Sequence, residues 1–490
     1  MPCFHRNRIS RRGFLTGGAG FIAGATAARA QQTRVGAATL DRLLRSQADP
    51  RRKVLLKGGT ILSLDPNTGD FEKGDVLIEG KTISAVAPDL SQAARSAIAV
   101  DASDRIVMPG FVDTHHHQYE TLLRSILSDG LLRDWPNNYT SVIQNVFTPL
   151  YLPEDAYISE LVASLNQINA GVTTTVDTSQ VSLSPAHTDG CITGLKESGR
   201  RAVFAYSAGV GPATQFPQDI ARLRKQYFSS ADQLLTLALN TGLTPDHWKL
   251  ARSVGAPIVS HFFAADLREM NEARLLGPDN EYIHCTQLNE ANWKMIADSG
   301  GKVSIAPAIE MQMRHGMPPF QAALDHGIRP SLSVDVECNM TADMFSIMRA
   351  AFTLQRALLN ERALAGEKNL PRLLTTRDTL GLATIEGART AHLDAKIGTL
   401  TPGKEADIIL LATDRINVFP LNNAPGAVVT LMDTSNVESV FIAGKVLKWQ
   451  GRLVGVDVNR IRRTADRARD ALVARAKYPR SLFDSCCPPA

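Results

Sequence analysis

Short apolar runs alternate with longer amphipathic stretches through the middle of this chain. Each run has the length of a buried strand, and the stretches between the runs have the apolar spacing of helices. Alternating strands and helices are typical of a parallel sheet, and eight such units make a (β/α)8 barrel. The pattern therefore predicts an α/β fold whose main domain, residues 108–395, is a TIM barrel. The eight predicted strands lie within residues 106–117, 171–180, 201–209, 234–242, 257–263, 281–288, 302–310 and 329–337.

The segments on either side of this region have a different pattern. Residues 52–107 and 396–455 consist of short runs that alternate apolar and polar positions, and glycine, proline and asparagine separate the runs. This pattern is typical of strands joined by tight turns. We expect one small β-sandwich domain formed from both ends of the chain. Residues 31–51 are expected to be a polar linker, and residues 456–490 a charged helix followed by a tail.

The first 30 residues have the features of a targeting segment. Arg11 and Arg12 precede a weakly apolar stretch rich in glycine and alanine, and Ala28 and Ala30 place small residues at a cleavage site. This arrangement resembles a bacterial twin-arginine signal peptide, with cleavage before Gln31. It predicts transport by the twin-arginine translocase to the periplasm or the medium. We expect no stable insertion in the membrane, because the rest of the sequence has no segment of spanning character.

Composition narrows the classes of protein that the chain can belong to. The 490 residues include 53 lysines and arginines and 49 acidic residues, and 44% are hydrophobic. Such a chain can bury a large core, which argues against disorder. Five of the arginines lie in residues 1–30, where there are no acids, so the remainder is close to neutral. A nucleic-acid partner is therefore not expected, and a small-molecule substrate is. A homo-oligomer is possible.

A histidine pair ends the first predicted barrel strand. His115 and His117 are two residues apart, so their side chains point to the same face of the strand, whereas His116 points to the other. The C-terminal ends of barrel strands carry the active sites of TIM-barrel enzymes. The pair is therefore expected to bind one metal ion at the mouth of the barrel.

Two more histidines and an aspartate end other predicted strands. His261 ends the fifth strand, His284 the sixth and Asp335 the eighth. These side chains are expected to meet the histidine pair at the same end of the barrel. Three neutral imidazoles and one carboxylate match a catalytic divalent-metal site that keeps a position open for water.

The runs PGFVDTHHH, SH, HC and SVD at these strand ends are similar to those of the metal-dependent amidohydrolase superfamily. The similarity extends over residues 53–455 and is strongest to the branch of cytosine deaminases, guanine deaminases and triazine chlorohydrolases. The resemblance implies that His115, His117 and His261 bind the metal. It also implies that Asp335 is the fourth ligand and the proton acceptor. In the same way His284 would hydrogen-bond the substrate carbonyl or the attacking hydroxide.

One metal ion per chain is expected. Binuclear members of the superfamily have a bridging carboxylated lysine, or a carboxylate in its place, on the fourth strand. The fourth strand here, LLTLALNTG, has neither. Zn²⁺ suits the predicted ligands, and Fe²⁺ fits them nearly as well.

The chain departs from the superfamily pattern after the fifth strand. Deaminases of this branch carry HxxE there, and the glutamate protonates the substrate ring. In this sequence Ala264 stands where that glutamate would be. Two other acids could replace it: Glu310, at the end of the seventh strand and near the mouth, or Glu337, on the same strand face as Asp335. Each could equally be a structural carboxylate.

Further residues are expected to contact the substrate. Gln180 ends the second strand, where an amide can bind a heteroatom, and His315 follows the seventh strand. Glu337 is a third candidate for a substrate contact. A loop position exposed to solvent is the alternative for His315.

These expectations combine into an exported mononuclear hydrolase. Attack of a metal-bound hydroxide would deaminate an amino-heterocycle or open a cyclic amide or amidine, both non-peptide C–N bonds. One alternative is a triazine-like chlorohydrolase or N-alkylamine hydrolase, since a halide leaves without a proton. Another is a non-catalytic periplasmic binding protein on a degenerate barrel. The sequence does not identify the substrate.

Overall fold

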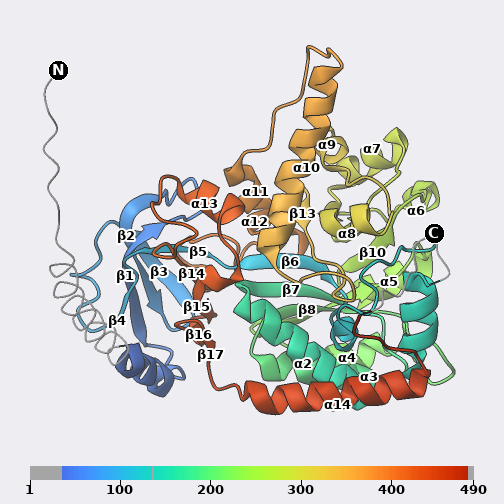
Figure 1. Ribbon diagram of the computed structural model, residues 1–490, viewed down its shortest axis with the longest axis horizontal. Coiled ribbons are helices and arrows are strands. Elements are labelled where there is room, and N and C mark those ends of the chain that lie inside the picture. Colours follow the sequence, from blue (N-terminus) through green and yellow to red (C-terminus); the bar gives the residue numbers. More distant parts are fainter. Residues whose placement is uncertain (1–35, 135–136, 484–490) are drawn as a thin grey trace, which may run out of the picture.

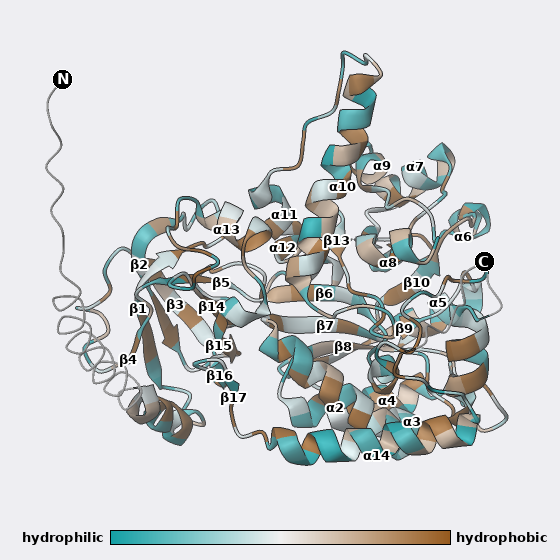
Figure 2. Cartoon of the chain, in the orientation of Figure 1, coloured by the Kyte–Doolittle hydropathy of each residue, from teal (hydrophilic) through white to brown (hydrophobic). Residues whose placement is uncertain are grey.

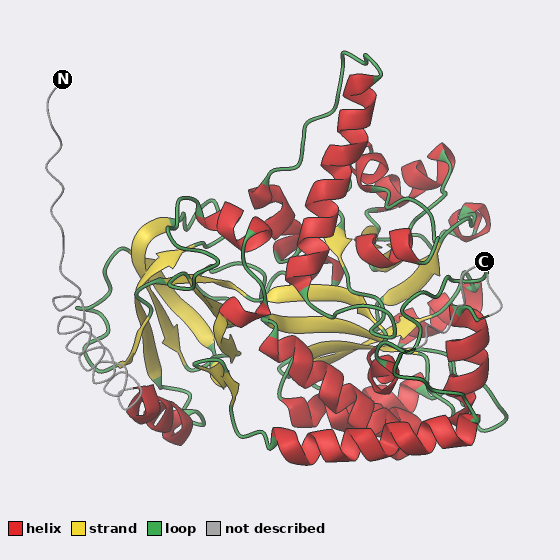
Figure 3. Ribbon diagram, in the orientation of Figure 1, coloured by secondary structure: helices red, strands yellow, loops and turns green. Residues whose placement is uncertain are grey.

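The computed structural model describes residues 36–134 and 137–483. Within these residues the chain forms a barrel of eight parallel strands beside a mixed sheet of nine strands (Figure 1). Helices surround the barrel, whereas the mixed sheet has few helices around it (Figure 3). The predicted fold class, a TIM barrel with a small β domain, is therefore confirmed.

The barrel strands follow one another in sequence order. Each pairs in parallel with the next, and a parallel bridge between His116 and Asp335 joins the last strand to the first. The backbone N–H of His117 donates to the Asp335 carbonyl over 2.7 Å, and that of Asp335 donates to the His115 carbonyl over 2.8 Å. The barrel therefore closes at residues predicted to bind the metal. Its strands are β6 (Phe111–His116), β7 (Val172–Ser179), β8 (Arg201–Tyr206), β9 (Leu235–Asn240), β10 (Ile258–Phe262), β11 (Asn280–His284), β12 (Lys302–Ile305) and β13 (Ser331–Leu332).

The mixed sheet is built from both ends of the chain. Strand β14 pairs antiparallel with β5, which joins the C-terminal strands to the N-terminal ones. The order is β17-β16-β15-β14-β5-β1-β2-β3, and β4 pairs with β1. The strands are β1 (Lys53–Ile61), β2 (Phe71–Glu79), β3 (Thr82–Ala87), β4 (Ile98–Asp101), β5 (Arg105–Pro109), β14 (Ile408–Ala412), β15 (Val437–Ile442), β16 (Lys445–Trp449) and β17 (Arg452–Leu453).

The first predicted barrel strand is two strands in different sheets. Strand β5 belongs to the mixed sheet and β6 to the barrel, and Gly110 separates them. A Cβ atom on Gly110 would lie 2.2 Å from the side chain of Thr173, so only glycine fits this close approach. The apolar pattern runs on through Gly110 because both strands are buried, and it does not reveal the change of sheet.

Most of the helices lie on the outside of the barrel. Helix α14 alternates hydrophobic and hydrophilic residues and lies along α2 (Figure 2). The α-helices are α2 (Pro153–Asn169), α3 (Pro185–Ser198), α4 (Ile220–Tyr227), α5 (Pro245–Ser253), α6 (Arg268–Glu272), α7 (Glu290–Ser299), α8 (Pro307–Gln312), α9 (Phe320–Asp325), α10 (Met344–Leu364), α11 (Thr376–Leu382), α12 (Ile385–Thr390), α13 (Ala424–Thr430) and α14 (Val458–Ala476). The remaining helical turns are η1 (Gln118–Leu123), η2 (Thr140–Phe147), η3 (Thr148–Leu150) and η4 (Thr434–Asn436).

The segment predicted to be a polar linker is partly helical. Residues 36–46 form a helix whose Leu43 is completely buried in the core of the β domain. The Trp449 indole N–H donates to the Gly36 carbonyl over 3.1 Å. The few apolar residues of this segment are enough to attach it, because they pack against the β domain. The predicted signal peptide lies outside the described residues. Within the described part of the chain, no helix is both long and apolar enough to cross a membrane.

Candidate active site

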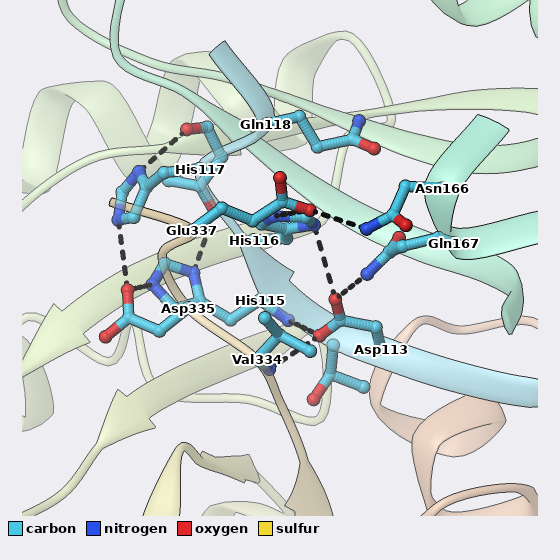
Figure 4. A network of polar contacts seen from close by, with 12 residues as sticks. Asp113, His115, His116, His117, Gln118, Asn166, Gln167, Val334, Asp335 and Glu337 are labelled. Carbon is cyan, nitrogen blue, oxygen red and sulfur yellow. Dashed lines mark hydrogen bonds and ion pairs between the residues drawn. The ribbon is translucent and has the colours of Figure 1, made fainter. Parts of the chain in front are cut away.

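Thr178 orients the two histidines at the end of β6. Its hydroxyl lies 2.9 Å from Nδ1 of His115, and its carbonyl oxygen lies 3.0 Å from Nδ1 of His117. A carbonyl only accepts hydrogen bonds, so Nδ1 of His117 carries the proton and Nε2 keeps its lone pair. Both Nε2 atoms point towards Asp335 (Figure 4).

Four side chains converge on one point at the C-terminal end of the barrel. Oδ1 of Asp335 lies 3.1 Å from Nε2 of His115 and 3.5 Å from Nε2 of His117. Nε2 of His261, on β10, lies 3.3 Å from Nε2 of His117. Atoms that bind one zinc ion tetrahedrally, at about 2.1 Å from the metal, are separated by about 3.4 Å. The spacing of these donors therefore fits a shared divalent cation.

The pKa values of His117, His261 and Asp335 also fit a metal. Burial lowers the pKa of His117 to about 3, and burial together with the neighbouring imidazoles holds the pKa of His261 well below its ordinary value. Burial alone would raise the pKa of Asp335, but the histidines around it hold that pKa well below the usual range. Neutral imidazoles around an ionised carboxylate are the donors that divalent zinc and iron prefer.

The backbone is strained at two residues of the site. His284 and Asp335 have φ angles of 71° and 74°, in the left-handed region that residues other than glycine rarely adopt. Such strain costs about 1–3 kcal/mol per residue and is concentrated at functional sites. It turns both side chains into the mouth of the barrel.

Glu310 contacts the site through His284. Its Oε1 atom lies 3.0 Å from Nδ1 of His284 and accepts the backbone N–H of Ala306 over 2.9 Å. On its other side, Nε2 of His284 lies 3.7 Å from Oδ2 of Asp335. Burial opposes the charge on His284, but the contacts with Glu310 and Asp335 outweigh it and raise the pKa of His284. For Glu310, by contrast, burial itself raises the pKa.

The position of Glu310 corrects the prediction from the sequence. Strand β12 ends at Ile305, and Pro307 begins α8, so Glu310 lies in the first turn of a helix and not at a strand end. There it is fully buried behind His284 and does not line the pocket. A direct contact with the substrate, as expected for an acid near the mouth, is therefore not available to it.

A pocket of about 210 Å³ opens above the four converging side chains. Gln180 and His315 line it, as the sequence predicted. His315 is only 6% exposed, and burial lowers its pKa to about 4, so its ring is neutral. The complete lining is His117, Leu132, Arg133, Tyr139, Thr140, Gln144, Gln180, His261, Phe263, His284, Met313, His315, Asp335 and Val336.

Glu337 lies away from this pocket, contrary to the prediction of a substrate contact. Its carboxylate forms an ion pair with Arg124 and accepts a hydrogen bond of 3.2 Å from Thr121. It also accepts a hydrogen bond of 3.2 Å from Asn166 (Figure 4). The prediction assumed that the chain stays extended after Asp335. The left-handed backbone of Asp335 breaks the two-residue alternation, and Glu337 turns towards η1 and α2 instead.

Sequence reasoning missed Thr178 and most of the pocket wall. Thr178 lies two residues before Gln180, so its position on the same strand face was a usable signal. Arg133, Tyr139 and Gln144 come from the long insertion after β6, where no periodic pattern indicates which side chains reach the pocket.

A barrel with these buried donors at its C-terminal mouth defines the class of metal-dependent hydrolases. The Amidohydrolase family model matches residues 106–447, and this chain belongs to that family of enzymes, which hydrolyse carbon–nitrogen bonds. The predicted family is therefore confirmed.

Proteins similar to this chain carry deaminase names. It is 27% identical to a 5′-deoxyadenosine deaminase of Methanosarcina mazei, over 86% of this chain and 99% of that protein. It is 28% identical to a 5-methylthioadenosine/S-adenosylhomocysteine deaminase of Syntrophus aciditrophicus, over 85% and 98%.

Solved structures share the fold. An adenosine deaminase from Xanthomonas campestris with bound zinc superposes with a TM-score of 0.76 at 23% identity, covering 86% of this chain and 99% of that one. An atrazine chlorohydrolase from Arthrobacter aurescens complexed with zinc superposes with a TM-score of 0.75 at 20% identity, covering 85% and 100%.

Proposed function

We propose that this protein is a mononuclear metal-dependent hydrolase that removes an amino group from a nitrogen heterocycle. The observation that carries the proposal is the convergence of His115, His117, His261 and Asp335 at the floor of a pocket that His284 also lines. The deaminase names of the similar proteins support the choice of bond and of an adenosine-like substrate.

The four converging side chains would hold the metal, and zinc suits them best. When bound, a divalent metal lowers the pKa of its water towards neutrality and so supplies a nucleophile. Fe²⁺ is the second candidate on the same donor set. Thr178 fixes the ring orientation of the two histidines of β6, which is the usual task of a side chain behind a metal ligand.

The pocket wall suits a flat, hydrogen-bonding ring. Phe263 offers an aromatic face, while Gln180 and His315 offer polar atoms that can bind ring nitrogens or a carbonyl. A ring held by these groups would present its amino-bearing carbon to the floor of the pocket.

Asp335 and His284 would move the protons. Asp335 would accept a proton from the attacking water and return it to the leaving nitrogen. His284, backed by Glu310, would donate from Nε2 to the substrate as negative charge develops on it. This pair would supply the proton that the missing HxxE glutamate supplies in relatives.

Ala264 supports a second candidate reaction. Without an acid at this offset, displacement of a halide from a triazine-like ring is less affected, because a halide leaves without a proton. Displacement of an alkylamine from such a ring still needs a proton on the leaving nitrogen. Opening of a cyclic amide would use the same attack by the activated water, on the amide carbon.

A panel of substrates distinguishes these reactions. The purified protein would be assayed with 5′-deoxyadenosine, 5-methylthioadenosine, atrazine and a cyclic amide, with ammonia, chloride and ring opening measured separately. Ammonia release that disappears in His117→Ala supports the proposal. Chloride release alone would favour the second reaction. If none of these substrates is turned over, the alternative of a non-catalytic binding protein would be favoured.

We also propose that the protein is exported through the twin-arginine pathway. The arginine pair and the small residues before Gln31 support this proposal. The route accepts folded proteins, which suits an enzyme that binds its metal before transport.

A further inference from the structure

We propose that His284, His315 and Asp335 form a second divalent-cation site beside the first centre. This site would fill only when metal is in excess, and the ion would then occupy the place of the substrate. The inference depends on the first centre but not on the proposed reaction, because metal binding is measured without turnover.

The carboxylate of Asp335 faces two groups of donors. Its Oδ1 atom lies nearest to Nε2 of His115, at 3.1 Å, and its Oδ2 atom lies 3.7 Å from Nε2 of His284. Donor atoms of His284, His315 and Asp335 all lie within 4.8 Å of one another. Asp335 can therefore bridge two ions, with one oxygen on each.

His284 has the arrangement of a metal ligand. In the neutral ring of His284, Glu310 accepts the hydrogen of Nδ1 over 3.0 Å, and the lone pair then lies on Nε2, which faces Asp335. Histidines that bind metals commonly donate their other N–H to a carboxylate in this way. When Nε2 carries no proton, a cation can take the position between it and Oδ2 of Asp335.

His315 supplies a donor that has no other use in the structure. His315 is only 6% exposed, and among the described residues neither ring nitrogen has a hydrogen-bond partner. Its backbone, by contrast, is fixed: the N–H donates to the Glu310 carbonyl over 3.0 Å, and the carbonyl accepts from Thr286 over 2.7 Å. The ring is thereby held in the pocket, with its centre 4.9 Å from that of His284.

The second site should be weaker than the first. It has three protein ligands where the first has four, and it shares Asp335 with the ion already bound. Arg133 adds positive charge nearby: its guanidinium lies 5.8 Å from the ring of Phe263, and that ring lies 6.0 Å from the ring of His315. Because all these side chains line the pocket, an ion there would exclude the substrate.

Equilibrium dialysis of the full chain against increasing zinc, with elemental mass spectrometry, tests the proposal. We expect two steps, the first ending at one ion per chain and the second at two, at a zinc concentration at least about tenfold higher. A single step that stays at one ion would overturn the inference and leave the proposed function standing. A chain that binds no metal would overturn both.

Variants locate the second step. His315→Ala and the larger His315→Gln should both keep the first step and lose the second. His326→Gln is the matched control, since His326 pairs with Glu290 at the surface and should keep both steps. A second step that persists in both His315 variants would place the second ion elsewhere and overturn the proposal.

Cobalt gives a test that needs no variant. Two Co²⁺ ions bridged by one carboxylate are magnetically coupled, so the second equivalent should diminish the electron paramagnetic resonance signal of the first. A signal that doubles with the second equivalent would show two separate ions and would contradict the shared Asp335.

Discussion

Oε1 of Glu310 lies 3.0 Å from Nδ1 of His284, in a contact that links a fully buried carboxylate to the floor of the pocket. Nε2 of the same ring lies 3.7 Å from Oδ2 of Asp335. The carboxyl group of Glu310, the imidazole of His284 and the carboxylate of Asp335 therefore form a row that ends in the site. In the proposed reaction these groups would supply the acid–base chemistry for which Ala264 provides no carboxyl group.

Glu310→Gln should slow turnover by about 100-fold with little change in KM, because the amide still fills the space but no longer stabilises a charged His284. The effect should be largest for substrates with poor leaving groups. Steady-state kinetics on a series of leaving amines checks this. The matched control is Glu281→Gln, which also replaces a buried carboxyl group by an amide. Burial raises the pKa of Glu281 well above its ordinary value. Equal slowing across the series would leave Glu310 a structural role.

Thr178→Val should weaken metal binding by about 10- to 100-fold, because the methyl group cannot hydrogen-bond Nδ1 of His115. The control is Thr174→Val on the same strand, since the hydroxyl of Thr174 is buried and has no hydrogen-bond partner among the described residues. Competition with a zinc chelator measures both affinities. If the two variants bind zinc equally, Thr178 does not orient His115.

Arg201→Met should lower the free energy of unfolding by about 3–5 kcal/mol, because it leaves a buried carboxylate without its partner. Arg201 binds both oxygens of Asp407, at 2.8 and 3.0 Å, and so joins β8 of the barrel to the segment before β14. Lys294→Met removes the exposed pair with Asp298 and should cost less than about 1 kcal/mol. Urea unfolding compares the two. If both variants lose a similar free energy of unfolding, the buried pair of Arg201 and Asp407 does not have the importance assigned to it.

The chain expressed in a bacterium with a twin-arginine pathway should be recovered from the periplasm with its N-terminus at Gln31. Replacing Arg11 and Arg12 together by lysine should keep it in the cytoplasm. N-terminal sequencing and cell fractionation check both outcomes. An intact Met1 on the recovered protein would refute cleavage and export.

Much of the architecture could be predicted because it depends on repeated local patterns. The alternation of apolar runs with amphipathic stretches indicated the barrel, and the two glycine-punctuated ends indicated the β domain. His115, His117, His261, His284 and Asp335 could be brought together because the barrel collects the ends of its strands on one side.

The remaining errors share a physical cause. The left-handed backbone of Asp335 and the start of α8 at Pro307 both interrupt an extended strand, and side-chain direction cannot be extrapolated across such a break. Glu337 and Glu310 lie just beyond these two points, and for this reason both were misplaced. Residues 36–46 were misread because their few apolar side chains acquire a partner only in the folded β domain.

The metal content of the folded protein tests the central claim most directly. Elemental mass spectrometry of the chain, purified without chelators and without added metal, should find about one zinc or iron ion per chain. The same measurement on Asp335→Ala should find a clearly lower content. Wild-type protein free of metal, or an Asp335→Ala variant that keeps the full complement, would contradict the account of the site.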